Sequence, residues 1–254
     1  MSIVTTAVVP CAGMGTRLRP LTRVVPKELL PWGDRPLIEH LLEELAQAGI
    51  VRTIIVLRND KEILRTHLEG GGIPTGMSVE YVEQQQPRGL ADALLAAREA
   101  IGKDPFLMAL PDQQFPGASA QLLKLYDGED SLSSAVDIPA DELQFFPGAA
   151  AVKIEGEGPV FKVLSMLPGE ETALCRAFGR TVFLPRLLEL IPENTDESGW
   201  GRAITEFLTT GVHGIVALDG SPADLGTMDG YVFYQKDAPL KHDSSPNKHS
   251  SMSK

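Results

Sequence analysis

A short segment near the start of the chain combines glycines, a hydroxyl group and a basic side chain directly after an apolar run. Residues 10–17 read PCAGMGTR. Gly13 and Gly15 lack a Cβ, so their backbone can adopt positive φ angles and bring N–H groups close to phosphate oxygens. Thr16 adds a hydroxyl group, and Arg17 adds a permanent positive charge. This loop predicts phosphate binding, although the same glycines would also suit a tight turn between a strand and a helix.

The spacing of the glycines excludes two common nucleotide-binding loops. A Walker loop requires Gly-Lys-Ser/Thr, which does not follow, and the dinucleotide-binding loop requires a third glycine, which is absent. The local charge nevertheless favours an anion. Five basic and two acidic residues lie between Met14 and Pro36, whereas the whole chain of 254 residues has a formal net charge of −11. Such an acidic protein is not expected to carry the broad basic face that general nucleic-acid binding needs.

The elements that must position this loop alternate between strands and helices. Apolar runs predict strands over residues 3–9, 52–57, 79–82 and 106–110, and helical spacing predicts helices over 37–48, 61–68 and 90–101. This alternation is typical of an α/β fold, in which helices cover both faces of a mostly parallel sheet. Ligands bind at the carboxyl ends of strands in such sheets, and the glycine loop follows the first strand.

From about residue 131 the pattern changes to short strands broken by Gly and Pro. We expect strands over 149–154, 160–166, 181–184 and 213–218, and helices over 185–190, 201–209 and 228–235. Residues 239–254 have no apolar periodicity and are predicted to be disordered. The two cysteines show no zinc or disulfide spacing, and no apolar run is long enough to span a bilayer. We therefore expect a cytoplasmic protein without membrane contact.

The segment PCAGMGTRLRPLT, followed by PKELLP, resembles the paired signature of the sugar-1-phosphate nucleotidylyltransferase family. Within that family it is most similar to the bacterial UTP:glucose-1-phosphate uridylyltransferases. The resemblance implies a Rossmann-like, mostly parallel sheet of the nucleotide-diphospho-sugar transferase type. It also implies a single domain over 1–238, with a nucleotide-binding half over about 1–130 and a mixed β sugar-binding half over about 131–238.

The reaction that this resemblance implies is attack of a sugar-1-phosphate oxygen on the α-phosphorus of a nucleoside triphosphate, giving a nucleotide-sugar and pyrophosphate. Such transfers develop negative charge on phosphate oxygens, so they need cations and N–H donors more than a protein nucleophile. Arg17 and Lys27 would be the catalytic cations, although outside the motif both would be typical surface charges. The implied nucleotide-binding residues of the loop are Ala12, Gly13, Gly15 and Thr16.

A later segment, EQQQPRGLA, resembles the family's base-recognition loop. In that loop a glutamine five residues before Gly-Leu-Ala reads the pyrimidine, and the same count here gives Gln84 with Gly89. An amide offers the acceptor and the donors that a uracil or thymine edge needs. Because Gln85 and Gln86 are adjacent amides, the choice among the three stays open, and a plain polar loop is the alternative.

Two aspartates resemble the family's metal ligands. Asp112 directly follows the strand predicted over 106–110, and Asp224 lies in the sequence Ala-Asp-Leu-Gly-Thr. Two carboxylates together with phosphate oxygens suit Mg²⁺, which takes oxygen ligands and keeps several waters. Each aspartate alone would be more typical of a helix cap or a turn.

The sugar-binding half matches the family less well. Gly148 resembles a glycine that lies against the hexose, and Gly179 resembles the glycine of a later Gly-Arg-Tyr strand, so both are implied sugar-binding residues. The family's Glu-Lys-Pro, however, is replaced by Met166-Leu167-Pro168. An apolar pair cannot hydrogen-bond hydroxyl groups or neutralise a phosphate, so binding of an ordinary hexose-1-phosphate should weaken.

Three basic residues are candidates to replace the family lysine. Alternation along a strand puts Lys162 on the face opposite Leu167, because five residues separate them. Arg176 or Arg180 could reach the acceptor phosphate instead. The glutamates of the helix over 37–48, including Glu44, are expected to face solvent.

Together these motifs predict transfer of a uridylyl group from UTP to a sugar-1-phosphate, with Mg²⁺ as cofactor. A thymidylyltransferase that uses dTTP is one alternative, because uracil and thymine present similar edges. A catalytically silent relative that binds a nucleotide as a sensor or partner protein is another, and a phosphate-binding scaffold without a nucleotide is the weakest. The resemblance also implies homo-oligomerisation, whereas the identity of the sugar stays open.

Overall fold

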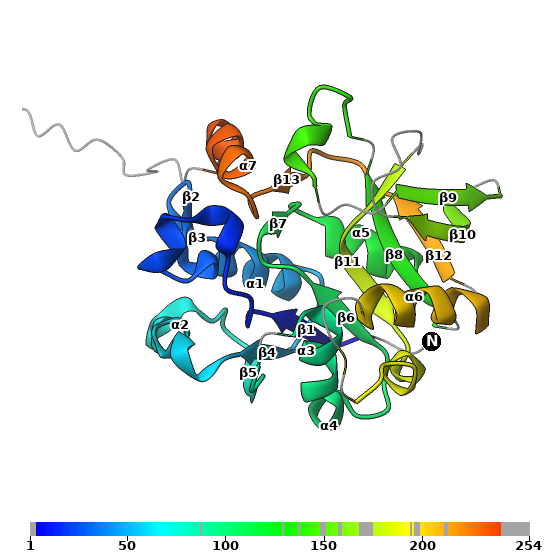
Figure 1. The fold of residues 1–254 in the computed structure, drawn as a ribbon, viewed down its shortest axis with the longest axis horizontal. Coiled ribbons are helices and arrows are strands. Elements are labelled where there is room, and N and C mark those ends of the chain that lie inside the picture. The colour runs from blue at the N-terminus through cyan, green and yellow to red at the C-terminus, as the bar shows by residue number, and fades with distance from the viewer. Residues whose placement is uncertain are drawn as a thin grey trace, which may run out of the picture.

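The computed structural model describes residues 4–86, 88–128, 130–136, 138–147, 151–156, 159–167, 175–193, 195, 199–210 and 213–239. Within these ranges, nine strands form one mixed sheet in the order β5-β4-β1-β6-β11-β8-β12-β10-β9 (Figure 1). The strands are β1 (Thr6–Pro10), β4 (Arg52–Leu57), β5 (Ser78–Glu83), β6 (Phe106–Ala109), β8 (Ser131–Val136), β9 (Ala151–Glu155), β10 (Val160–Leu167), β11 (Cys175–Phe183) and β12 (His213–Ala217).

Helices and two small two-stranded pairings lie around this sheet. The helices are α1 (Leu37–Gln47), α2 (Glu62–His67), α3 (Leu90–Ala96), α4 (Arg98–Ile101), α5 (Ala118–Leu125), α6 (Gly199–Thr210) and α7 (Met228–Phe233). The small pairings join β2 (Pro31–Trp32) to β3 (Arg35–Pro36) and β7 (Gln113–Gln114) to β13 (Ala223–Asp224). No helix in the described ranges has the length and apolar character needed to cross a lipid bilayer.

The first four strands of the sheet are parallel, and their order creates a switch point. From β1 the chain proceeds outward to β4 and β5, and then returns to β6 on the other side of β1. Crossovers therefore leave the edge of the sheet in opposite directions between β1 and β6. In open α/β sheets this is where the carboxyl ends of the strands form a ligand-binding crevice.

The remaining strands continue the same sheet with mixed directions. β11 is antiparallel to both β6 and β8, and β12 is parallel to β8. β10 and β9 complete the sheet in antiparallel pairings. The two halves expected from the sequence thus share one continuous sheet.

Side chains of β1 alternate between two hydrophobic clusters on the two faces of the sheet. Ala7 and Val9 belong to the cluster with α1 and α5, whereas Val8 belongs to the cluster with α3 and α6. All three side chains are fully buried, as expected for a parallel strand that is covered on both faces. Figure 1 shows α3 and α6 lying along the same side of the sheet, where they contact each other. The predicted α/β fold is therefore confirmed.

Several predicted elements have different bounds. The strand predicted over 3–9 is β1, one helix predicted over 90–101 is divided into α3 and α4, and residues 185–189 form a 3-10 helix. The sequence pattern missed α5 and β8. Every residue of β8 is buried, but its three serines hide the apolar signal. One of them, Ser134, donates to the Arg180 carbonyl oxygen at 2.9 Å.

A bulge in β10 corrects the alternation argument about Lys162. Lys162 pairs with Glu155 and Leu167 pairs with Ala151, with a register shift between Val163 and Ser165. The two partner positions on β9 are four residues apart rather than five, because the bulge adds one residue to β10. The argument that strict alternation separates Lys162 from position 167 is therefore wrong.

Candidate active site

A cavity of about 410 Å³ opens at the carboxyl ends of β1 and β6, where the strand order reverses. Its lining comes from segments that are far apart in the sequence, including the glycine loop, the turn after Pro26 and the segment after β6. The structure brings nine of the predicted site residues together in this lining: Ala12, Gly13, Thr16, Arg17, Lys27, Gln84, Gly89, Asp112 and Asp224.

The carbonyl groups of the glycine loop are bound from within the protein. The Lys61 ammonium group donates to the carbonyl oxygens of Cys11 and of Gly13, the latter at 2.8 Å. The Thr22 hydroxyl group donates to the Gly15 carbonyl oxygen at 2.8 Å. Gly15 has a φ of +62°, and a Cβ there would lie 2.9 Å from Thr22 Cγ2, so the turn requires glycine.

The N–H groups of the same loop have no such partners. Among the described residues, the backbone N–H groups of residues 12–15 donate to no other protein group. Successive free N–H groups on a tight loop form a concave anion-binding nest. The loop thus presents donors rather than acceptors, as the phosphate-loop prediction requires.

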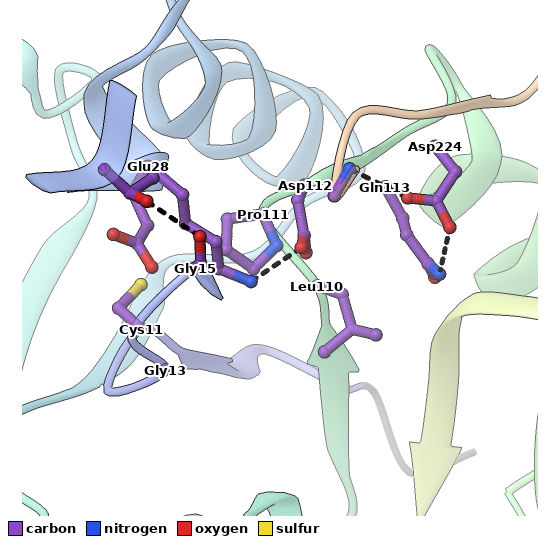
Figure 2. A network of polar contacts seen from close by, with 12 residues as sticks. Cys11, Gly13, Gly15, Glu28, Leu110, Pro111, Asp112, Gln113 and Asp224 are labelled. Atoms are coloured by element: carbon purple, nitrogen blue, oxygen red, sulfur yellow. Dashed lines mark hydrogen bonds and ion pairs between the residues drawn. The ribbon is translucent and has the colours of Figure 1, made fainter. Parts of the chain in front are cut away.

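The sequence analysis missed the buried ion pair beneath this loop. Lys61 Nζ lies 2.9 and 2.8 Å from the two carboxylate oxygens of Glu28, and the two residues are 6% and 0% exposed. Figure 2 shows Glu28 beside Cys11. Two signals were available in the sequence, because Glu28 directly follows Lys27 and Lys61 lies just after β4, the neighbour of β1.

Lys27 makes a close ion pair with Asp112. The Lys27 ammonium donates to Asp112 Oδ2 at 2.6 Å, from a 3-10 turn that spans Lys27–Leu29. Burial acts to lower the pKa of Lys27, but the carboxylates of Asp112 and Glu28 outweigh burial and raise it. Burial likewise acts to raise the pKa of Asp112, but Lys27 prevails and lowers it. Both side chains are therefore held in their charged forms.

Asp224 reaches the same region from the late segment of the chain. β13 pairs with β7 so that Asp224 lies opposite Gln113, and the Leu225 N–H donates to the Asp112 carbonyl oxygen at 2.8 Å. In Figure 2, Gln113 lies between Asp112 and Asp224 and is joined to Asp224 by a hydrogen bond of 3.4 Å. Burial and the charge of Asp112 raise the pKa of Asp224 to about 6.

The two carboxylates approach one point, at Gly226. A Cβ added there would lie 2.8 Å from Asp112 Oδ2 and 3.0 Å from Asp224 Oδ1, so only glycine leaves this space between them. Burial and the neighbouring Asp112 both raise the pKa of Asp224, so a positive charge beside it would favour its ionised form. A hard cation with oxygen ligands fits such a pair. The described part of the chain holds no cluster of three or more His, Cys, Asp or Glu side chains that could bind a metal ion, so a cation at this point would need oxygen ligands besides the two carboxylates.

Gln84 is fixed at another wall of the cavity. Its Nε2 group donates to the Gly89 carbonyl oxygen at 3.2 Å and to Asp92 Oδ2 at 2.6 Å, and the residue is 3% exposed. Because both N–H donors are engaged by the protein, Oε1 is the atom left for a ligand. A carbonyl acceptor of this kind matches the N3–H donor of uracil or thymine. Neighbouring Gln85 and Gln86 are exposed, which favours Gln84 among the three amides.

The acceptor side is only partly described. Gly148 and Pro168 lie outside the described residues, and of Met166 and Leu167 only their place in β10 is described. Gly179 has a φ of +38° and lies against the side chain of Gln113, whose Oε1 a Cβ at residue 179 would approach to 2.5 Å. Gly179 is thus one residue removed from the cavity, whose lining includes Gln113.

Arg180 is excluded as the replacement for the missing family lysine. Its side chain is fully buried, and its Nη2 and Nε lie 2.5 and 3.1 Å from Glu44 Oε2. Glu44 is 7% exposed, so the expectation that it faces solvent is wrong. A buried arginine held by a buried carboxylate joins α1 to β11 and has a structural role.

Comparisons with known proteins give related sequences and structures. Residues 6–141 match the family model described as nucleotidyl transferase. The chain is 29% identical over 262 residues to the UTP–glucose-1-phosphate uridylyltransferase of Bacillus subtilis, covering 91% of this chain and 90% of that protein. It is 26% identical over 271 residues to the enzyme of the same name from Streptococcus pneumoniae, covering 93% and 90%.

Solved structures show the same fold. A UDP-glucose pyrophosphorylase complexed with UDP-glucose superposes with a TM-score of 0.79 at 24% identity, over 92% of this chain and 98% of that one. The UDP-glucose pyrophosphorylase of Acinetobacter baumannii gives a TM-score of 0.77 at 26% identity, over 91% and 92%.

Proposed function

The chain belongs to the nucleotidyl transferase family, and we propose that it transfers a uridylyl group from UTP to a sugar-1-phosphate, giving a UDP-sugar and pyrophosphate. One observation carries the proposal. The free N–H groups of the loop, the Lys27–Asp112 pair, Asp224 and the Gln84 acceptor all meet at one cavity. The N–H groups and Lys27 match the phosphates, Asp112 and Asp224 match a metal ion, and Gln84 matches the base of a pyrimidine nucleoside triphosphate.

The base and the triphosphate are bound by different residues. Gln84 Oε1 accepts from N3–H of uracil, and Asp92 and Gly89 keep the amide in this orientation. The N–H groups of residues 12–15, Thr16 and Arg17 receive the phosphate oxygens. Arg17 also lies close enough to Asp112 and Asp224 for its charge to act on both carboxyl groups. It contributes to the lowered pKa of Asp112 and partly offsets the rise in the pKa of Asp224.

The family generally uses a divalent metal ion, and we propose that the ion here is Mg²⁺, held by Asp112 and Asp224. Bound magnesium would neutralise phosphate charge and make the α-phosphorus more open to attack. Lys27 stabilises the charge that develops on the phosphate oxygens during the displacement. With Asp112 beside it, its ammonium group stays protonated throughout the neutral pH range.

The identity of the acceptor sugar is left open by the substitution at Met166 and Leu167. One solved neighbour is titled a putative glucose-1-phosphate thymidylyltransferase from Bacillus anthracis, and at 21% identity it supports the fold alone. Homo-oligomerisation, the division of the domain near residue 130 and a cytoplasmic location stay predictions.

A pyrophosphate-release screen tests the proposal. Purified protein is incubated with Mg²⁺, each of UTP, dTTP, ATP and GTP, and a panel of sugar-1-phosphates. We expect turnover with UTP and at least one sugar-1-phosphate, and its loss in Lys27→Ala and Asp224→Ala. If UTP binds but none of the pairs reacts, the protein is a silent nucleotide-binding relative, and faster turnover with dTTP would assign it as a thymidylyltransferase.

A further inference from the structure

Lys61 is the only described side chain that reaches the carbonyl groups of Cys11 and Gly13. Its ammonium group has three N–H donors and contacts three acceptor groups. These are the Cys11 carbonyl, the Gly13 carbonyl and the Glu28 carboxylate. Every donor is thus engaged inside the protein, and none is left for a substrate. The side chain therefore acts on the loop rather than on the ligand.

The buried location of the Lys61–Glu28 pair is unusual for charged side chains. Lys61 and Glu28 are both buried, and burial of an ion pair is costly unless further hydrogen bonds satisfy both partners. Apolar residues of similar size would fill the same space at lower cost. They could not bind two backbone carbonyl groups, however, and those carbonyl groups would then be free to rotate toward the cavity.

We propose that the Lys61–Glu28 pair positions the phosphate loop, because it binds the carbonyl groups of Cys11 and Gly13 and so leaves the loop's N–H groups facing the triphosphate. This inference deepens the proposed function and rests on it for the identity of the nucleotide. A peptide unit carries its carbonyl and its N–H on opposite sides, so fixing the carbonyl also fixes the direction of the next N–H. A carbonyl oxygen turned into the cavity would instead repel a phosphate.

The same pair connects the loop to Lys27. Glu28 and Lys27 are consecutive residues of one 3-10 turn, and they bind Lys61 and Asp112 respectively. Glu28 thereby fixes the backbone from which Lys27 reaches the cavity. Lys61 and Glu28 are positioning residues, since neither lines the main cavity, and their loss should affect triphosphate binding more than base binding.

The test compares a charge-free double variant with a destabilised control. Glu28→Gln combined with Lys61→Met removes both charges at nearly constant volume, so that neither is left buried alone. Leu64→Ala is the matched control, because Leu64 is fully buried in α2, three residues after Lys61, and does not line the cavity. Both proteins are compared with the unmodified chain for the Kd of UTP and of inorganic tripolyphosphate by calorimetry, and of uridine by NMR titration.

We expect the double variant to bind UTP and tripolyphosphate at least tenfold more weakly while binding uridine within twofold of the unmodified chain. Leu64→Ala should lower Tm but keep all three affinities. The inference is overturned if the double variant keeps its affinity for tripolyphosphate, or if uridine binding weakens to the same extent as UTP binding. Tripolyphosphate binding that responds to the variant, in a protein that does not bind UTP, would support the loop inference and refute the proposed nucleotide.

Discussion

On the nucleotide side, polar groups from the loop, the Lys27 turn, the end of β6 and the late segment around Asp224 line one cavity, where Lys27 and Asp112 form an ion pair. On the acceptor side, the position of the family's Glu-Lys pair holds Met166 and Leu167, and the buried Arg180 is committed to Glu44. Because several charges act together on the nucleotide side, we expect substitutions there to cost more activity than substitutions on the acceptor side.

The largest effect is expected from Lys27→Ala. This change removes the cation that we propose for the transition state and leaves Asp112 without its ion-pair partner. Loss of one preorganised charge typically lowers kcat by about 10²–10³-fold, and we expect the upper end of this range here. Initial rates of pyrophosphate release measure it. A decrease below tenfold would show that the nucleotide side does not depend on this cation and would remove the contrast between the two sides.

The two aspartates proposed to bind the metal should give nearly equal losses of activity but opposite changes in stability. Asp112→Asn and Asp224→Asn are each expected to lower kcat by about 10²-fold, because each removes one of the two proposed charged ligands. Without metal, however, Asp112→Asn should lower Tm, since it leaves the partly buried Lys27 without its ion-pair partner. Asp224→Asn should raise Tm at neutral pH, since it removes a poorly compensated buried charge.

The pH dependence of stability follows from the same shifts. The pKa of Asp224 in the folded protein is about 6, above its ordinary value of 3.8, so its contribution is present below pH 3.8 and is lost as pH rises through 6. The cost at neutral pH is roughly 3 kcal/mol, from about 1.36 kcal/mol for each pKa unit. Asp112 has a lowered pKa, so its contribution is present above its ordinary value and is lost as pH falls through the folded pKa.

Unfolding of the metal-free proteins between pH 4 and pH 8 checks this prediction. The gain in Tm of Asp224→Asn over the unmodified chain should grow as pH rises through 6 and should vanish near pH 4. Equal gains at both ends of the range would contradict the pKa shift of Asp224. Addition of Mg²⁺ at pH 8 should stabilise the unmodified chain and have little effect on the variant.

A smaller effect is expected at the base. Gln84→Leu removes one neutral hydrogen bond to N3–H, worth roughly 0.5–1.5 kcal/mol, so kcat/KM for UTP should decrease by about tenfold or less. Leucine also leaves Asp92 without its donor from Gln84. The exposed neighbour Gln86 provides the control, because Gln86→Leu should leave kcat/KM unchanged. A larger effect at Gln86 would move base recognition to another residue of the triplet.

The smallest effect is expected on the acceptor side. Leu167→Lys restores the residue type of the family motif and should lower the KM for a hexose-1-phosphate by several-fold, because it adds one charge-assisted contact to the phosphate. The KM for UTP should not change. If the KM for UTP shifts instead, the two sides are coupled and the comparison between them fails.

The motifs that resemble the family named nine residues that the structure brings to one cavity. Lys27 and Asp112 are two of them, and the structure adds that they form an ion pair between segments that are 85 residues apart. Glu28 and Lys61 were missed, because charged residues in a turn and near the start of a short helix look like surface residues. Their roles depend on burial, which arises only when β1 and β4 pair side by side.

Each error in the sequence-based prediction arises at a particular residue or strand. Glu44 was assigned to the solvent-facing side of α1, but its partner Arg180 comes from a strand 136 residues away, which no helical periodicity can reveal. The argument about Lys162 failed at a single bulge. β8 was missed because its serines are satisfied by polar groups of β11, including the Arg180 carbonyl. For Glu44 and β8 the deciding contact is long-range, whereas for Lys162 it is a bulge between neighbouring strands.

The most direct test of the account is to follow the α-phosphorus itself. The protein is incubated with Mg²⁺, [α-³²P]UTP and sugar-1-phosphates, and the products are separated by chromatography. We predict that the label moves from UTP into a UDP-sugar while unlabelled pyrophosphate is released, and that Lys27→Ala abolishes the transfer. Label that remains in bound, unreacted UTP with every acceptor would contradict the account.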